Sequence, residues 1–157
     1  PIIVKHGGVV VKFEADNCFA SFPDVLPAVE AGVELNGTFF RMNELTPDEF
    51  DIRVSIGIDH GDILLTGGPD YFGNPVIGAS KLGEDTATAG EILATKRAFE
   101  RIPAEAGITG THMMLSMSGM DWDTVKIDFP EPTASVEAPG GGGDSEDLEE
   151  LLNRESS

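Results

Sequence analysis

The sequence predicts an α+β domain built on one mixed or antiparallel sheet. Short runs rich in β-branched and aromatic residues come in closely spaced pairs, which is typical of hairpins. Two longer segments carry apolar residues at helical spacing. The chain has 157 residues, of which 40% are hydrophobic and 24% charged. A domain of this size buries enough surface to fold without a disulfide or a structural metal.

The first predicted unit is a hairpin followed by a helix. Residues 9–13 (VVVKF) and 18–22 (CFASF) flank the polar turn 14–17, so we expect them to pair as two strands. Asp24 is a suitable N-cap for a helix that ends near residue 43. Valines recur every four residues in this segment, and they predict a buried stripe.

The middle of the chain predicts a second hairpin. Residues 52–58 alternate strictly, with isoleucine and valine on one face, which is typical of a half-buried strand. The turn 59–61 leads into a second strand at 62–66, which we expect to pair with the first. A loop at 45–51 precedes this unit, and the turn residues 67–70 end it.

The second half of the sequence predicts two more helices and three more strands. In order, these are a helix at 76–89, a strand at 90–95, a short helix at 96–101 and a closing hairpin of strands 111–117 and 124–129. In the first of these helices, Ala79, Leu82 and Ile77 are expected to face inward.

Two regions are expected along the chain, a folded domain at 1–130 and a tail at 131–157. The tail contains a glycine-rich linker and then the acidic, leucine-containing run 145–152. Two interpretations of this run stay open, a frayed acidic tail and a short helix that docks on a partner. Because the chain opens at Pro1, we interpret the sequence as a fragment of a longer protein.

Charge and composition exclude several classes of partner. The chain has 28 acidic and ten basic residues, a formal net charge of −18. This argues against nucleic acid and anionic membranes, because lysine and arginine drive phosphate binding. No apolar run approaches the roughly 20 residues of a membrane span, and no secretory signal leads the chain. With a single cysteine, Cys18, we expect a cytoplasmic domain without membrane contact.

Common nucleophile, phosphate-loop and metal motifs are absent from the sequence. What remains is a set of charged residues at predicted strand ends, namely Lys12, Asp16 and Asp70. Taken singly, each is typical of a solvated turn. Their sequence context is more informative.

Four segments share an order and a spacing. They are KFEAD at 12–16 before an apolar strand, RVSIGIDHG at 53–61, DYFGNPVIGASKL at 70–82 and GEIL at 90–93. They resemble K-x-x-G-D, R-x-G-I-x-x-G, D-x-[FW]-G-x-x-V-N-x-A-x-R-L and G-E-I-L in the catalytic domain of class III nucleotidyl cyclases. The resemblance covers residues 9–102.

The resemblance implies a ferredoxin-like mixed or antiparallel sheet with helices on one side. It also implies that the family's first strand and two helices, with the first metal aspartate, lie upstream, so the fragment alone is expected to be inactive. The implied activity is conversion of ATP to cyclic AMP and pyrophosphate, in cyclic nucleotide signalling. Family members build this site across a homodimer, or a heterodimer with another cyclase domain.

The resemblance also assigns roles to single residues. Asp16 matches a ligand of the family's two metal ions, Mg²⁺ or Mn²⁺. Lys12 and Asp70 match the pair that reads adenine, whereas guanine readers carry Glu and Cys there. Lys81 stands where the family has the arginine that stabilises the charged phosphorus, and Ile77 where it has a ribose-orienting asparagine.

These departures lead to three functional hypotheses. The first is an adenylate-cyclase-type domain of reduced activity, because lysine lacks the bidentate fork of arginine and Ile77 donates no hydrogen bond. The second is a catalytically degenerate cyclase-homology module for nucleotide binding, dimerisation or regulation. The third is an unrelated α+β interaction domain, which would gain support if Lys12 and Asp70 did not face a common cleft.

Overall fold

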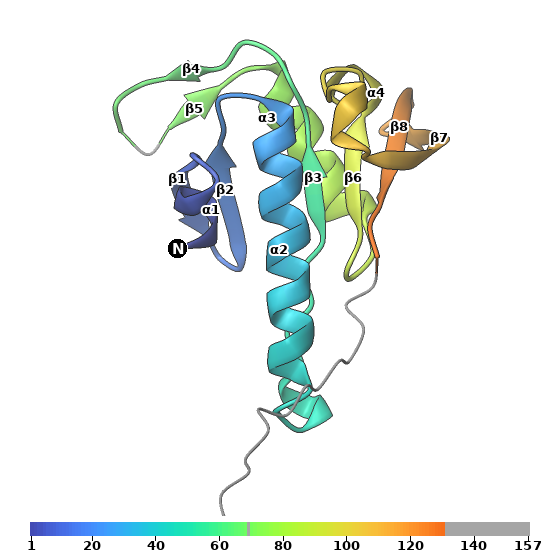
Figure 1. Cartoon of the computed structure of the whole chain (residues 1–157). Helices are drawn as coiled ribbons and strands as arrows, with labels where there is room; N and C mark the ends of the chain where they lie inside the picture. The colour runs from blue at the N-terminus through green and yellow to red at the C-terminus, as the bar shows by residue number, and fades with distance from the viewer. Residues whose placement is uncertain (69, 131–157) are drawn as a thin grey trace, which may run out of the picture.

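The computed structural model describes residues 1–68 and 70–130, and this part of the chain has the predicted α+β class (Figure 1). Its strands form one four-stranded mixed sheet and two separate two-stranded sheets. The helical elements are α1 (Ile2–Lys5), α2 (Val25–Asn43), η1 (Asp48–Phe50), α3 (Asn74–Ser80), η2 (Lys81–Thr86), α4 (Lys96–Phe99) and η3 (Ala104–Ala106). The strands are β1 (Val9–Glu14), β2 (Asn17–Ser21), β3 (Ile56–Ile58), β4 (Leu64–Leu65), β5 (Tyr71–Phe72), β6 (Ile92–Thr95), β7 (Thr109–Met117) and β8 (Met120–Asp128).

The four-stranded sheet has the order β3-β6-β8-β7. The β3 and β6 strands run parallel, with Ile58 opposite Ala94, whereas β6–β8 and β8–β7 are antiparallel. The predicted closing hairpin is confirmed as β7–β8. Its turn contains Ser118 and Gly119, both at positive φ, the backbone that a two-residue hairpin turn requires.

The long helix α2 packs against β3 and β6 on one face of this sheet, and Figure 1 shows α2 running alongside β3. The Asp24 carboxylate caps the helix by accepting the Val25 N–H at 2.8 Å, as predicted. The predicted valine stripe packs into a core that includes Val29, Ile92 and Ile127. Burial of such side chains is worth roughly 1.5–3 kcal/mol each.

Helices also cover the opposite face, which corrects the expectation of helices on one side only. Successive residues of a strand point to opposite faces; Ile56 packs near Gly32 of α2, and Gly57 therefore faces the other way. A Cβ at Gly57 would collide with the Ala79 carbonyl and with Gly83. Two glycines thus let α3 and η2 approach the back of β3 at backbone contact distance.

The predicted hairpin of strands 52–58 and 62–66 is wrong. Only Ile56–Ile58 is a strand, and it pairs with β6, while β4 pairs with β5. The physical reason is Asp59, whose side chain is fully buried and accepts a hydrogen bond from Arg97 Nε at 2.7 Å. This contact ties the end of β3 to α4, so the chain does not turn back.

The predicted helix at 76–89 is shorter and less regular than expected. It starts at Asn74, becomes π-helical at Lys81 and ends at Thr86, whose hydroxyl donates to the Lys81 carbonyl at 3.0 Å. Leu82 is fully buried as predicted, but Ile77 is 54% exposed. The helix buries Pro75 and Gly78 against the sheet, and this places Ile77 on the outer side.

The predicted linker and the acidic run 145–152, for which a frayed tail and a docking helix both stayed open, lie outside the described residues. In the ranges 1–68 and 70–130, no helix is both long and apolar enough to span a bilayer.

Candidate functional site

Lys12 lies on β1 inside a small cluster of aromatic and charged side chains. Its ammonium is 2.9 Å from Glu14 Oε2, and the Lys12 side chain is 28% exposed. The same ammonium lies over two rings, 5.4 Å from the centroid of Phe19 and 5.5 Å from that of Tyr71. Both distances fall within the range of cation–π attraction.

Asp70 and Lys12 lie close enough for their charges to interact. The pKa of Lys12 is raised above its usual value, first by its hydrogen bond with Glu14 and further by the charges of Tyr71 and Asp70. Lys12 belongs to β1, whereas Asp70 directly precedes β5, a strand of a different two-stranded sheet. Asp70 directly precedes Tyr71, whose ring centroid is 5.5 Å from the Lys12 ammonium; adenine recognition by this pair stays a prediction.

The sequence reasoning missed the aromatic part of this cluster. The Phe19 and Tyr71 ring centroids are 5.6 Å apart with an interplanar angle of 47°. Burial raises the pKa of the Tyr71 hydroxyl, Glu14 and Glu84 raise it further, and Lys12 opposes the shift. The phenol is therefore neutral near pH 7. The position of Tyr71 directly after Asp70 was the one signal in the sequence that could have placed this ring in the cluster.

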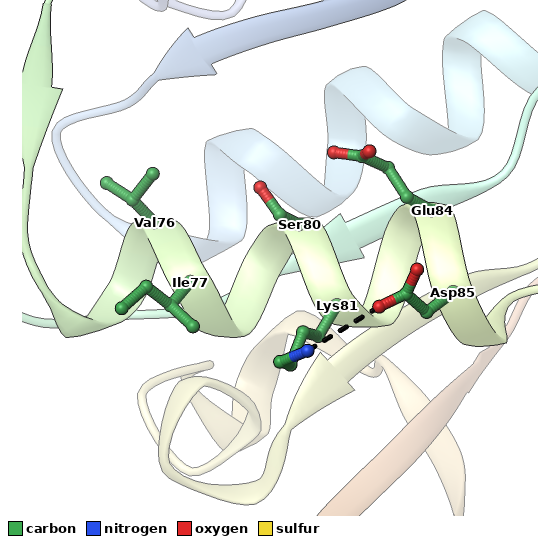
Figure 2. A pocket seen from close by; sticks show the side chains of 6 residues that line it. All are labelled: Val76, Ile77, Ser80, Lys81, Glu84 and Asp85. Carbon is green, nitrogen blue, oxygen red and sulfur yellow. Dashed lines mark ion pairs between the residues drawn. The ribbon is translucent and has the colours of Figure 1, made fainter. Parts of the chain in front are cut away.

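Lys81 belongs to a second cluster, which borders a shallow pocket of about 300 Å³ on α3 and η2 (Figure 2). The pocket is lined by Val76, Ile77, Ser80, Lys81, Glu84 and Asp85. Figure 2 shows Ile77, Lys81 and Asp85 along one side of this helix. The Lys81 ammonium is 3.6 Å from Asp85 Oδ2 and donates to Ser118 Oγ at 3.0 Å.

Each of the two clusters presents one lysine. Lys12 offers a donor in the first cluster, and Lys81 offers a cation at the pocket in the second.

Comparisons with known proteins show which solved structures have a fold similar to that of this chain. No family model and no curated protein matches the chain. Among solved structures, an adenylate/guanylate cyclase/hydrolase from Silicibacter pomeroyi is 25% identical with a TM-score of 0.71, over 81% of this chain and 76% of that one. The chain has the fold of the class III nucleotidyl cyclase catalytic domain.

Further cyclase structures agree with this assignment. The adenylyl cyclase CyaB from P. aeruginosa is 19% identical with a TM-score of 0.67, over 82% of this chain and 76% of that one. The guanylate cyclase domain of RhGC from Catenaria anguillulae, in complex with GTP, is 18% identical with a TM-score of 0.61, over 81% of this chain and 75% of that one. The cyclase fold is thus shared with adenylate and guanylate cyclases alike.

Asp16, the predicted metal ligand of this cyclase fold, lies exposed in the turn between β1 and β2. In the described ranges, no group of three His, Cys, Asp or Glu side chains is placed to hold a metal ion. Mg²⁺ keeps several of its waters and is bound in proteins through one or two carboxylates plus substrate phosphates, and the exposed carboxylate of Asp16 suits such a ligand.

The turn that carries Asp16 also contains a departure from the family motif with a structural consequence. Ala15 replaces the family's glycine and adopts a left-handed φ of 52°. A residue with a Cβ pays roughly 1–2 kcal/mol for this conformation. The turn therefore adopts a backbone conformation that glycine would reach at a lower cost in stability.

Proposed function

We propose that the chain is an adenylate cyclase catalytic domain of reduced activity, which converts ATP into cyclic AMP and pyrophosphate. The observation that carries this proposal is the contact of the Lys12 ammonium with the ring of Tyr71, the residue directly after Asp70, within a cyclase fold. In the reaction, the ribose 3′-oxygen loses its proton and bonds to the α-phosphorus. The bond from that phosphorus to the bridging oxygen breaks, and pyrophosphate leaves.

Lys12 and Asp70 favour adenine over guanine for a simple chemical reason. The lysine ammonium donates to ring N1 of adenine, and the carboxylate accepts from its 6-amino group. Guanine presents the opposite pattern, an N–H at N1 and an oxygen at C6. Each polar group of the protein would then meet a like group of the base, and mismatches of this kind discriminate strongly.

Lys81 supports the phosphate groups in this proposal, but more weakly than an arginine would. It supplies one positive charge without a planar fork, and Asp85 and Ser118 already engage that charge. Loss of one well-placed donor costs roughly 10²–10³ in rate. Ile77, on the same side of the pocket, adds no hydrogen bond to the ribose.

The proposed site is completed by a second cyclase domain, either another copy of this chain or a related one. The upstream segment, to which the resemblance gives the first metal aspartate, would complete with Asp16 the ligands for Mg²⁺ or Mn²⁺, and the cation would offset phosphate charge. The exposed apolar side chains of Leu64, Leu65 and Phe72, which are 64%, 54% and 59% exposed, offer a surface for that partner. We place this assembly in the cytoplasm, where ATP is available.

A degenerate cyclase-homology module is the second candidate. The exposure of Ile77 at the pocket favours it, because a nonpolar residue stands where the ribose would need a donor. In this case the domain would still bind nucleotide or pair with a competent cyclase. Catalysis would be absent.

The test uses the full-length natural protein with Mn²⁺ and either ATP or GTP, with cyclic product measured by chromatography. We expect cyclic AMP, slow turnover, and a preference that moves toward GTP in Lys12→Glu combined with Asp70→Cys. Ile77→Asn combined with Lys81→Arg is expected to raise kcat about tenfold or more. ATP binding without product in either background would favour the degenerate module, and an unchanged base preference would contradict the adenine assignment.

A further inference from the structure

The Lys12 ammonium contacts the rings of Phe19 and Tyr71, two residues to which the proposed reaction gives no role. We propose that Phe19 and Tyr71 form an aromatic clamp that positions the Lys12 ammonium toward Asp70 and thereby determines base specificity. This inference rests on the proposed function, because it concerns how the adenine-reading lysine is held. The rings lie on β2 and β5, so the clamp also joins the two small sheets.

The geometry of the clamp is that of an ammonium shared between two ring faces. The Lys12 ammonium is 5.4 Å from one ring centroid and 5.5 Å from the other. The rings themselves are in contact, with centroids 5.6 Å apart. Each interaction is favourable within about 6 Å, and together they restrict a side chain that otherwise has four rotatable bonds.

Two charged groups compete for the same ammonium. Glu14 pairs with it at 2.9 Å, and Asp70 acts on it from the β5 side. Glu14 is itself 65% exposed in its side chain, so without the rings Lys12 would be free to follow Glu14 into solvent. The clamp opposes that movement and holds the ammonium against Tyr71 at the start of β5, directly after Asp70.

The phenol hydroxyl of Tyr71 is not required for this role. Phe19 acts on the ammonium through its ring alone, and Tyr71 lies at nearly the same distance. Tyr71→Phe therefore keeps the interaction, whereas Tyr71→Leu and Phe19→Leu remove a ring while retaining an apolar side chain. These variants make a matched set.

The experiment measures dissociation constants for ATP and for GTP on the full-length protein by calorimetry, with thermal unfolding as a control for folding. We expect each leucine variant to lower the ATP preference about two- to fivefold, and Tyr71→Phe to stay close to wild type. Lys12→Met is expected to abolish the preference. Adding a leucine substitution to Lys12→Met should then have no further effect, because the rings act through Lys12.

The binding data distinguish failure of the adenine proposal from failure of the clamp proposal. If the wild type binds both nucleotides equally, the adenine proposal fails and the clamp with it. If Lys12→Met abolishes the preference but both leucine variants keep it, the clamp alone is wrong. If the leucine effects persist in the Lys12→Met background, the rings contact the base directly, and a positioning role is overturned.

Discussion

The two halves of the molecule differ in how completely they bury their apolar residues. In the sheet half, defined as β3, β6, β7 and β8 with α2, α3 and η2, Val29, Leu82 and Ile92 are fully buried. In the hairpin half, defined as β1–β2 with β4–β5, Phe13 is 73% exposed and Leu64 64% exposed. Three of the four predicted site residues lie in or beside this exposed half, so the buried core and most of the predicted site belong to different parts of the chain.

Buried polar groups show the same contrast. Asp59 in the sheet half is fully buried, and Arg97 and Thr95 satisfy its carboxylate. Such a pair is costly to break, because the remaining partner would be left without compensation. In the hairpin half Lys12 pairs with an exposed glutamate, and exposed ion pairs contribute little to stability. That leaves Lys12 available to change partner when a ligand arrives.

The largest effect is expected from truncating the core of the sheet half. Leu82→Ala removes a fully buried side chain and should lower the free energy of unfolding by about 3 kcal/mol. The matched control, Leu65→Ala, removes a side chain that is 54% exposed and should change it by less than about 0.5 kcal/mol. Urea unfolding measures both. A large loss for Leu65→Ala that depends on protein concentration would show that a partner covers the hairpin half.

A smaller effect is expected from acid, through Glu91 beside β6. Its hydrogen bond with Lys126 Nζ, at 2.6 Å, lowers the pKa of Glu91 from 4.5 to about 2. A carboxyl with a lowered folded-state pKa stabilises the protein above its unfolded pKa. This contribution should therefore disappear as pH falls from about 4.5 to about 2.

Urea unfolding of the wild type and of Glu91→Gln across this pH range measures the contribution. Solvent reaches both partners, so we expect a difference of only about 1–2 kcal/mol at pH 6, shrinking toward zero at pH 2. Glu49→Gln, at an exposed position in η1, is the control and should show no such convergence. A constant difference between wild type and Glu91→Gln would contradict the assignment.

The smallest effect concerns the turn of the hairpin half. Ala15→Gly relieves the left-handed backbone at φ 52° and should stabilise the protein by about 0.5–1 kcal/mol, since part of the gain is lost to the entropy of the unfolded chain. Ala20→Gly, in the extended strand β2, should destabilise it by a similar amount. Thermal unfolding of the two variants measures both changes in stability. Loss of stability in both variants would show that Ala15 is not strained.

Local patterns in the sequence were sufficient to predict the elements whose pairing or capping partners are close in the chain. The hairpins β1–β2 and β7–β8 and the capped helix α2 follow from alternation, turn residues and the Asp24 cap, because each of these acts over a few residues. The four motifs at 12–16, 53–61, 70–82 and 90–93, in their order and spacing, were sufficient to predict the cyclase fold. Asp59 was misread as a turn residue, because nothing in its neighbourhood signals burial.

Only the tertiary structure decided which distant segments meet. The parallel pairing of β3 with β6 joins residues 36 positions apart, as in Ile56 with Ile92. The same holds for Lys12 with Tyr71 and for Lys81 with Ser118. Periodicity tells which face of an element is apolar, but not what will cover it. The sequence thus determined the local elements and the family of the fold, whereas long-range packing determined which faces are covered, the ion pair between the buried Asp59 and Arg97, and the contacts of Lys12 with Phe19 and Tyr71.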